Sequence, residues 1–144
     1  MREFKRIILH CTATPPGMHV DVATIRKWHQ ARGWSDCGYH FVLHLDGTIE
    51  RGRPIHKVGA HTKQHNEDSV GIAYAGGVTD EMVPHDTMTV HQEISFLLLV
   101  RSLRTIYGPM TIHGHNEFAN KACPSFTVRD KFKFLTLHQD GISD

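Results

Sequence analysis

The chain has 144 residues, 40% of them hydrophobic and 22% charged, which is typical of one globular domain spanning residues 1–144. Sixteen Lys and Arg against fifteen Asp and Glu leave a formal charge of +1, which excludes the broad basic field of a non-specific nucleic-acid binder. Three cysteines are too few for a disulfide framework, whereas thirteen histidines are many for this length. We expect a core at about residues 6–137 and a frayed C-terminal tail.

The sequence carries no visible signal for export or membrane insertion. The apolar run at residues 7–9 stops at His10, and the strongly apolar stretch at residues 96–100 is far shorter than the roughly 18 residues of a membrane span. We therefore expect a soluble monomer without a membrane partner. We also expect it to be made in the cytoplasm without a signal peptide and to act outside only after release through another factor.

The chain opens with a predicted strand and a predicted helix. Residues 5–11 are mostly aliphatic or β-branched and precede a turn-forming segment, so we expect a short strand with His10 near its end. Asp21 is a suitable N-cap for a helix that ends near Gly33. Residues at helical spacing, which we expect to face the core, are Val22, Ile25 and Trp28.

A hairpin and a long loop follow. Residues 39–45 and 48–51 flank the dipeptide Asp46-Gly47, which predicts a β-hairpin with a two-residue turn. Residues 54–68 lack clear periodicity and predict an irregular loop, where functional residues are common. Residues 69–75 predict a buried strand.

The C-terminal half completes an α/β pattern. Thr89 and Gln92 form a capping-box pattern before a long helix that ends at Gly108, and the broad apolar surface of this helix predicts burial. Residues 110–113 predict a strand and residues 128–137 a short helix. Strands that alternate with about three helices, together with the antiparallel hairpin, predict a single α/β domain with a mixed β-sheet.

Candidate metal ligands gather where His113-Gly114-His115 precedes Cys123. One histidine and one cysteine at this spacing are a weak zinc signal, and locally hydrogen-bonded histidines with a buried cysteine are the alternative. His10 can supply a third ligand, and three protein ligands with a water describe a catalytic zinc site. The residues alone do not choose between His113 and His115.

The order of several motifs resembles the zinc-dependent N-acetylmuramoyl-L-alanine amidases. Within that family the chain is most similar to the small single-domain phage or prophage endolysins, in a superfamily shared with peptidoglycan recognition proteins. The resemblance extends in colinear order from about residue 6 to residue 126. The motifs that carry it are Ile8-Leu9-His10-Cys11-Thr12-Ala13-Thr14, Arg26-Lys27-Trp28-His29, Gly33-Trp34-Ser35-Asp36, Gly38-Tyr39-His40-Phe41, Asp46-Gly47-Thr48, Val58-Gly59-Ala60-His61, Asn66 with Ser69-Val70-Gly71-Ile72, and Lys121-Ala122-Cys123-Pro124-Ser125-Phe126.

This resemblance implies a reaction and a set of site residues. The zinc ligands fall on His10, His115 and Cys123, with one zinc ion per chain, and the catalytic groups fall on Tyr39 and Lys121. The implied substrate is bacterial peptidoglycan, and the implied reaction is hydrolysis of the amide bond between N-acetylmuramic acid and L-alanine, which lyses the cell wall.

The residue types suit this chemistry. Amide hydrolysis needs a nucleophile, which a zinc-activated water supplies, and stabilisation of the carbonyl oxygen, which Lys121 can provide as a fixed cation. Tyr39 can hydrogen-bond the water or the intermediate. Which of the two residues transfers the proton to the leaving amine stays open here.

Other histidines and polar residues have both functional and structural interpretations. His61, Asn66 and Ser69 can contact substrate, although a turn-forming Asn and a strand-capping Ser are equally good accounts. His40 and His44 alternate with apolar residues, so we expect them on a half-exposed polar face.

Two other functions compete with the zinc amidase, and a third can accompany it. One is a cysteine hydrolase in which Cys123 is the nucleophile and His115 the base. Another is a module that binds peptidoglycan without cleaving it, which the intact Cys123 disfavours. The resemblance to small phage amidases also allows a second function, binding and inhibition of a phage RNA polymerase.

We expect Cys11, which follows a candidate ligand in a strand, to point away from the metal.

Overall fold

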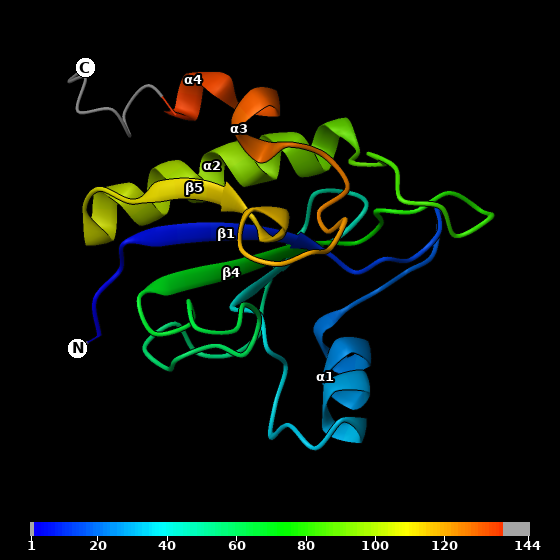
Figure 1. Ribbon diagram of the computed structural model, residues 1–144, viewed down its shortest axis with the longest axis horizontal. Helices are drawn as coiled ribbons and strands as arrows, with labels where there is room; N and C mark the ends of the chain where they lie inside the picture. Colours follow the sequence, from blue (N-terminus) through cyan, green and yellow to red (C-terminus); the bar gives the residue numbers. More distant parts are fainter. Residues whose placement is uncertain (1, 137–144) are drawn as a thin grey trace.

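The computed structural model describes residues 2–136, so the tail for which we expected fraying lies outside the described residues. These residues form one five-stranded sheet with helices on both faces (Figure 1). In chain order the elements are β1 Arg6–Cys11, α1 Val22–Ala31, β2 Phe41–Leu43, β3 Ile49–Arg51, β4 Ser69–Tyr74, α2 Val90–Tyr107, β5 Thr111–Gly114, the 3-10 helix η1 His115–Glu117, α3 Val128–Lys131 and α4 Lys133–Thr136.

The sheet is mixed, as the sequence predicts. Its strand order is β3-β2-β4-β1-β5, and every neighbouring pair is parallel except β2 with β3. β1 lies between β4 and β5, where His10 pairs with Ala73 and Leu9 with Gly114. Because parallel strands end at the same edge of a sheet, the end of β1 and the chain that leaves β5 come together there.

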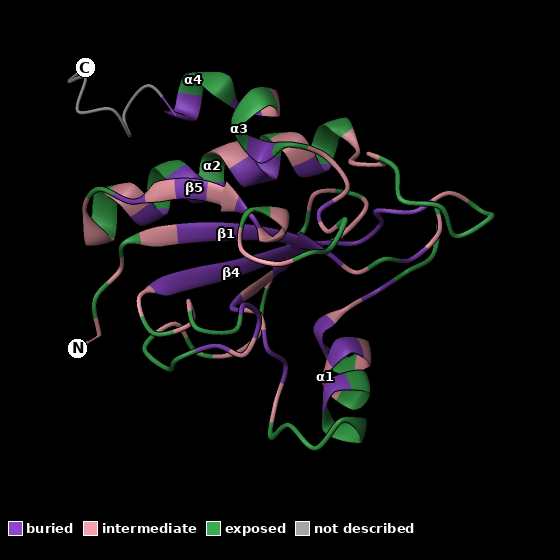
Figure 2. Ribbon diagram, viewed as in Figure 1, coloured by how far each residue is buried: buried purple, intermediate pink, exposed green. Residues whose placement is uncertain are grey.

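Two apolar clusters cover the two faces of this sheet. Alternate residues of β1, among them Ile7 and Leu9, pack into the larger cluster with α2, α3 and α4. The smaller cluster joins Ile25 of α1 to Val42 of β2 on the opposite face. Figure 2 shows the central strands buried and the outer surfaces of α1 and α2 exposed. Because successive side chains of a strand point to opposite faces of the sheet, His10 points to the face that α2 does not cover.

The predicted caps of α1 and α2 are confirmed. The Asp21 side chain accepts the Thr24 backbone N–H at 2.9 Å, and Thr89 and Gln92 form the expected capping box. The inward face of α1 differs from the prediction, since His29 is buried while Trp28 is 38% exposed. The His29 Nδ1 accepts the backbone N–H of Gly38 at 2.8 Å. This hydrogen bond from the loop after α1 holds His29, rather than Trp28, on the inward face of the helix.

α2 is less buried than its composition predicts. It packs against the sheet through Phe96, Val100 and Leu103, whereas one stripe of its outer surface is exposed. The residues of that stripe are Val90, Ile94 and Leu98. A helix on one face of a sheet buries only the side that it turns to the sheet. Within residues 2–136 we find no helix long and apolar enough to cross a membrane.

The remaining differences are local. In the hairpin, the Gly47 N–H donates to His44 O, so the turn is centred on Leu45 and Asp46, and Gly47 follows with a φ of 91°. The predicted C-terminal helix is divided at Phe132 into α3 and α4.

Candidate active site

Three side chains with metal-binding atoms meet at the carboxyl edge of the sheet. His10, His115 and Cys123 each offer one such atom, all within 4.8 Å of one another, and they are the single group of this kind within residues 2–136. The His10 Nδ1 lies 3.8 Å from the Cys123 Sγ, and the two imidazole rings are 4.6 Å apart between centroids. Two imidazoles and a thiolate suit zinc, and a set of three leaves a fourth position for water.

Each ligand candidate comes from a different part of the fold. His10 is the penultimate residue of β1, and His115 begins η1 directly after β5. Cys123 lies in the loop before α3, and this loop is tied to the sheet by the Tyr74 hydroxyl, which donates to Pro124 O at 2.7 Å. The site therefore depends on contacts between segments more than 100 residues apart in the sequence.

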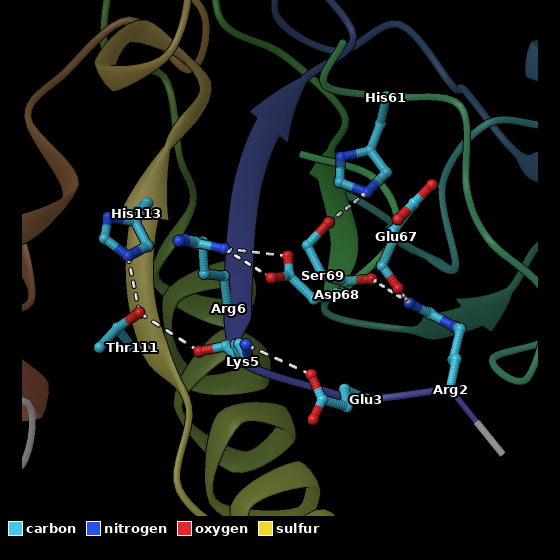
Figure 3. A network of polar contacts seen from close by, with 10 residues as sticks. All are labelled: Arg2, Glu3, Lys5, Arg6, His61, Glu67, Asp68, Ser69, Thr111 and His113. Atoms are coloured by element: carbon cyan, nitrogen blue, oxygen red, sulfur yellow. Dashed lines mark hydrogen bonds and ion pairs between the residues drawn. The ribbon is translucent and has the colours of Figure 1, made fainter. Parts of the chain in front are cut away.

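The structure brings His115, and not His113, to the other two ligand candidates. Both ring nitrogens of His113 are engaged elsewhere, Nε2 with Thr111 Oγ1 at 2.7 Å and Nδ1 with Glu117 Oε1 at 2.8 Å. Figure 3 shows the His113 ring directed at Thr111 of the same strand. The residues alone do not choose between His113 and His115 as a ligand. In the structure, the change from strand to 3-10 helix at His115 makes that choice.

Burial keeps the two imidazoles of the site neutral. It lowers the pKa of His10 well below 6.5, and the neighbouring His61 and His115 lower it further. Burial and then the Lys121 ammonium also lower the pKa of His115. Neutral imidazole is the form that binds a metal ion.

The pKa of the Cys123 thiol is shifted in the opposite direction to those of the two histidines. A hydrogen bond with the Cys11 thiol and burial raise its pKa, so the isolated site holds a protonated thiol. A divalent cation supplies the charge that stabilises the thiolate. This electrostatic setting disfavours a cysteine hydrolase, which needs a low-pKa thiolate without a metal. Cys11 is not part of the group of three ligand candidates and its side chain packs in the larger core cluster, but its thiol contacts that of Cys123 and so does not point away from the site as the sequence predicts.

The two predicted catalytic residues lie beside this group. The Tyr39 ring is 5.0 Å from the His10 ring between centroids. Burial, followed by the nearby Cys123, raises the pKa of Tyr39, so the phenol stays protonated at neutral pH and is a hydrogen-bond donor. Lys121 is exposed and lines the same cleft as His115.

A cleft of about 490 Å³ opens beside the site. Its aromatic walls are Trp34 and Phe118, which sequence reasoning did not connect with the site. Trp34 lies in one of the motifs that resemble the amidase family, whereas no sequence pattern indicates Phe118. A second cavity of about 510 Å³ lies between α2 and the segment after β3, and it contains none of the candidate ligands.

The three predicted substrate contacts occupy different positions. Asn66 lines the cleft, yet its Oδ1 accepts the backbone N–H groups of His61 and Thr62, each at 2.9 Å, and so fixes the loop. Ser69 is fully buried, and its Oγ lies 3.2 Å from His61 Nε2 (Figure 3). His61 also lines the cleft but is only 8% exposed.

The sequence predicts a half-exposed position for His40, and this prediction is wrong, because His40 is only 1% exposed. Its Nδ1 accepts the Gly71 N–H at 3.0 Å, and its Nε2 donates to Lys57 O at 2.8 Å. The loop at residues 54–68 covers this ring, and burial lowers the pKa of His40 to about 4.

Residues 1–126 match the family described as N-acetylmuramoyl-L-alanine amidase. The chain belongs to this family. It is 41% identical over 123 residues to the endolysin of Escherichia phage T7, an alignment that covers 85% of this chain and 82% of that endolysin. It is 39% identical over 128 residues to the endolysin of Enterobacteria phage K11, covering 89% of this chain and 85% of that protein.

Solved structures share this fold. The N-acetylmuramoyl-L-alanine amidase LysC from Clostridium intestinale superimposes with a TM-score of 0.80 at 29% identity, covering 96% of this chain and 87% of that one. Drosophila peptidoglycan recognition protein LB shares the fold, with a TM-score of 0.74 at 23% identity over 86% of this chain and 76% of that one. The resemblance inferred from the motifs is thereby confirmed.

Proposed function

We propose that this amidase-family protein is a cell-wall lytic enzyme that hydrolyses the amide bond between N-acetylmuramic acid and L-alanine in peptidoglycan, using one zinc ion per chain. The observation that carries the proposal is the meeting of His10, His115 and Cys123 beside an open cleft. Three ligands of this chemistry hold zinc and leave one position for catalysis.

The protein residues divide the work of the reaction. When bound, the zinc ion supplies an activated water as the nucleophile at neutral pH. Lys121 stabilises the negative charge that develops on the substrate carbonyl oxygen. Tyr39, which stays protonated, can donate a hydrogen bond to the water or to the intermediate.

The cleft is suited to an amphipathic polymer. Trp34 and Phe118 offer flat apolar surfaces for sugar rings, and Lys63 offers positive charge for the carboxylates of a peptide stem. Family membership supports peptidoglycan as the substrate.

The deciding experiment is mass analysis of purified peptidoglycan after digestion, with and without a chelator. We expect glycan strands free of peptide and stem peptides with a new L-alanine amino terminus, and we expect chelation to stop the reaction and added zinc to restore it. Full activity of a metal-free preparation would overturn the zinc assignment. A rise in reducing sugar without new L-alanine termini would indicate a glycosidase, and binding without any product would indicate a recognition module.

Three expectations from the sequence stay predictions. They are a monomeric state, release to the cell wall through another factor, and binding of a phage RNA polymerase. Light scattering of the purified protein tests the first, fractionation of producing cells with and without a membrane-permeabilising factor tests the second, and a binding titration with purified polymerase tests the third.

A further inference from the structure

A buried contact between two histidines lies directly behind the candidate metal site. The His10 Nε2 is 2.8 Å from the His61 Nδ1, and the two side chains are 1% and 8% exposed. The other ring nitrogen of His10, Nδ1, faces the Cys123 Sγ at 3.8 Å. One nitrogen of His10 therefore faces the ligand group, and the other faces His61.

This arrangement specifies where the protons are. A neutral imidazole has one N–H, so if the His10 Nδ1 offers its lone pair to a metal, Nε2 carries the proton and needs an acceptor. The nearest acceptor is the His61 Nδ1, since the Thr62 Oγ1 is more distant at 3.3 Å. His61 then carries its own proton on Nε2, which faces the Ser69 Oγ at 3.2 Å.

The His61 ring is held in place by close packing. It lies over Gly71 of β4, where a Cβ would come within 2.5 Å of the His61 Cδ2, and beside Gly59, where a Cβ would come within 2.7 Å. Asn66 fixes the backbone of His61 from the loop side. Figure 3 shows the ring directed toward Ser69 at the start of β4. Two glycines thus provide the space that an imidazole occupies.

We propose that His61 is a positioning residue for the metal site, which accepts the Nε2–H of His10 and so keeps the His10 Nδ1 unprotonated and directed at the zinc ion. This inference rests on the proposed zinc-dependent function and deepens it. It replaces substrate contact as the main role of His61, because both ring nitrogens already face protein partners, Nδ1 the His10 Nε2 and Nε2 the Ser69 Oγ. A hydrogen-bond acceptor behind a ligating histidine fixes its tautomer and its orientation.

The first test is the zinc affinity of the purified protein, measured by competition with a chromophoric chelator. His61→Leu removes the acceptor, and we expect it to weaken zinc binding by about 10- to 100-fold. In His61→Asn the side-chain oxygen stands near the position of Nδ1, so we expect most of the affinity to return. His113→Asn is the matched control on β5, and it should bind zinc as the wild type does.

The outcomes separate positioning from its alternatives. Wild-type zinc affinity in His61→Leu, with a raised KM, would assign His61 to the substrate and overturn the inference. A loss in Thr62→Val as large as that in His61→Leu would shift the role to the threonine and also overturn it. If His61 variants change zinc affinity but the wild type cleaves no peptidoglycan, the inference stands and the proposed function fails.

A second test uses only the wild-type chain, so it does not depend on a variant that folds. Nitrogen-15 NMR of the zinc-loaded protein should show His10 protonated at Nε2 and His61 protonated at its own Nε2. A scalar coupling across the hydrogen bond should connect the His10 Nε2 with the His61 Nδ1. A proton on the His61 Nδ1, or no coupling between these two nitrogens, would contradict the proposal.

Discussion

The backbone N–H of Cys11 donates a hydrogen bond to the Sγ of Cys123 at 3.2 Å. This bond links the last residue of β1 to a loop residue that follows it by 112 positions in the chain. Because the donor is a backbone group, no substitution at Cys11 other than proline removes it. It also remains available when Cys123 is a thiolate that binds a metal ion. An N–H donor stabilises negative charge on sulfur, so the sheet itself contributes to the site.

The ligand assignment predicts which substitutions lose the metal. Cys123→Ser and His115→Ala should lose bound zinc and amidase activity together, because each removes one of three ligands. His113→Ala should retain most of both, since its ring bonds to Thr111 and Glu117. Metal content by mass spectrometry, measured beside turnover, decides this. Loss of zinc in the His113 variant alone would place the ligand two residues earlier.

The catalytic assignment predicts variants that keep zinc but turn over slowly. Lys121→Met and Tyr39→Phe each remove a donor that acts mainly in the transition state, so turnover should fall by about 10² to 10³. Zinc content should stay at the wild-type level because neither residue belongs to the ligand group.

The measurement for these variants is turnover on soluble muropeptide with zinc-replete protein, with substrate binding titrated separately. Binding should change much less than turnover. A variant that retains more than about a third of wild-type turnover would show that its residue takes no part in the chemistry, since loss of such a donor costs far more.

The loop that carries Cys123 should depend on Tyr74. Tyr74→Phe removes the hydroxyl that donates to Pro124 O and leaves a buried carbonyl without this partner, which should lower the free energy of unfolding by about 1–3 kcal/mol. Zinc affinity should fall too, because Cys123 is adjacent to Pro124. Urea unfolding and zinc competition measure both effects, with Tyr107→Phe at the far end of α2 as the control for the change of residue type. Equal zinc affinities in the two variants would refute the role of Tyr74.

The buried His40 predicts a loss of stability in mild acid. Its pKa is lowered from 6.5 to about 4 in the folded protein, chiefly by burial. Between these values the unfolded chain binds a proton and the folded protein does not, so stability falls as the pH falls from about 6.5 to about 4. The full shift corresponds to about 3 kcal/mol.

A matched variant isolates this contribution. In His40→Asn the amide oxygen can still accept the Gly71 N–H, but the side chain does not titrate. Denaturant unfolding of the zinc-free proteins at pH 7 and pH 4.5 should therefore show a smaller loss for the variant than for the wild type. Equal losses would mean that His40 is not a source of the acid sensitivity.

Much of this protein is determined by local sequence. Asp21 and the pair Thr89 and Gln92 begin α1 and α2 where their cap chemistry predicts, because a cap needs only residues within one turn. The strand segments are recognisable because buried parallel strands are almost continuously apolar, as β4 is. The colinear motifs were also sufficient to identify the amidase family.

The residues by themselves did not decide which of the many histidines act together; the family resemblance assigned His10 and His115, and only the tertiary structure gives the physical reason. His113 and His115 flank the same residue, Gly114, so the sequence around them does not distinguish them. The turn from β5 into η1 directs only His115 to His10. Likewise, the sequence shows neither that His40 lies beneath the loop at residues 54–68 nor that His61 lies over Gly71. These contacts join segments that only the folded sheet brings together, and local propensity carries no information about such distant partners.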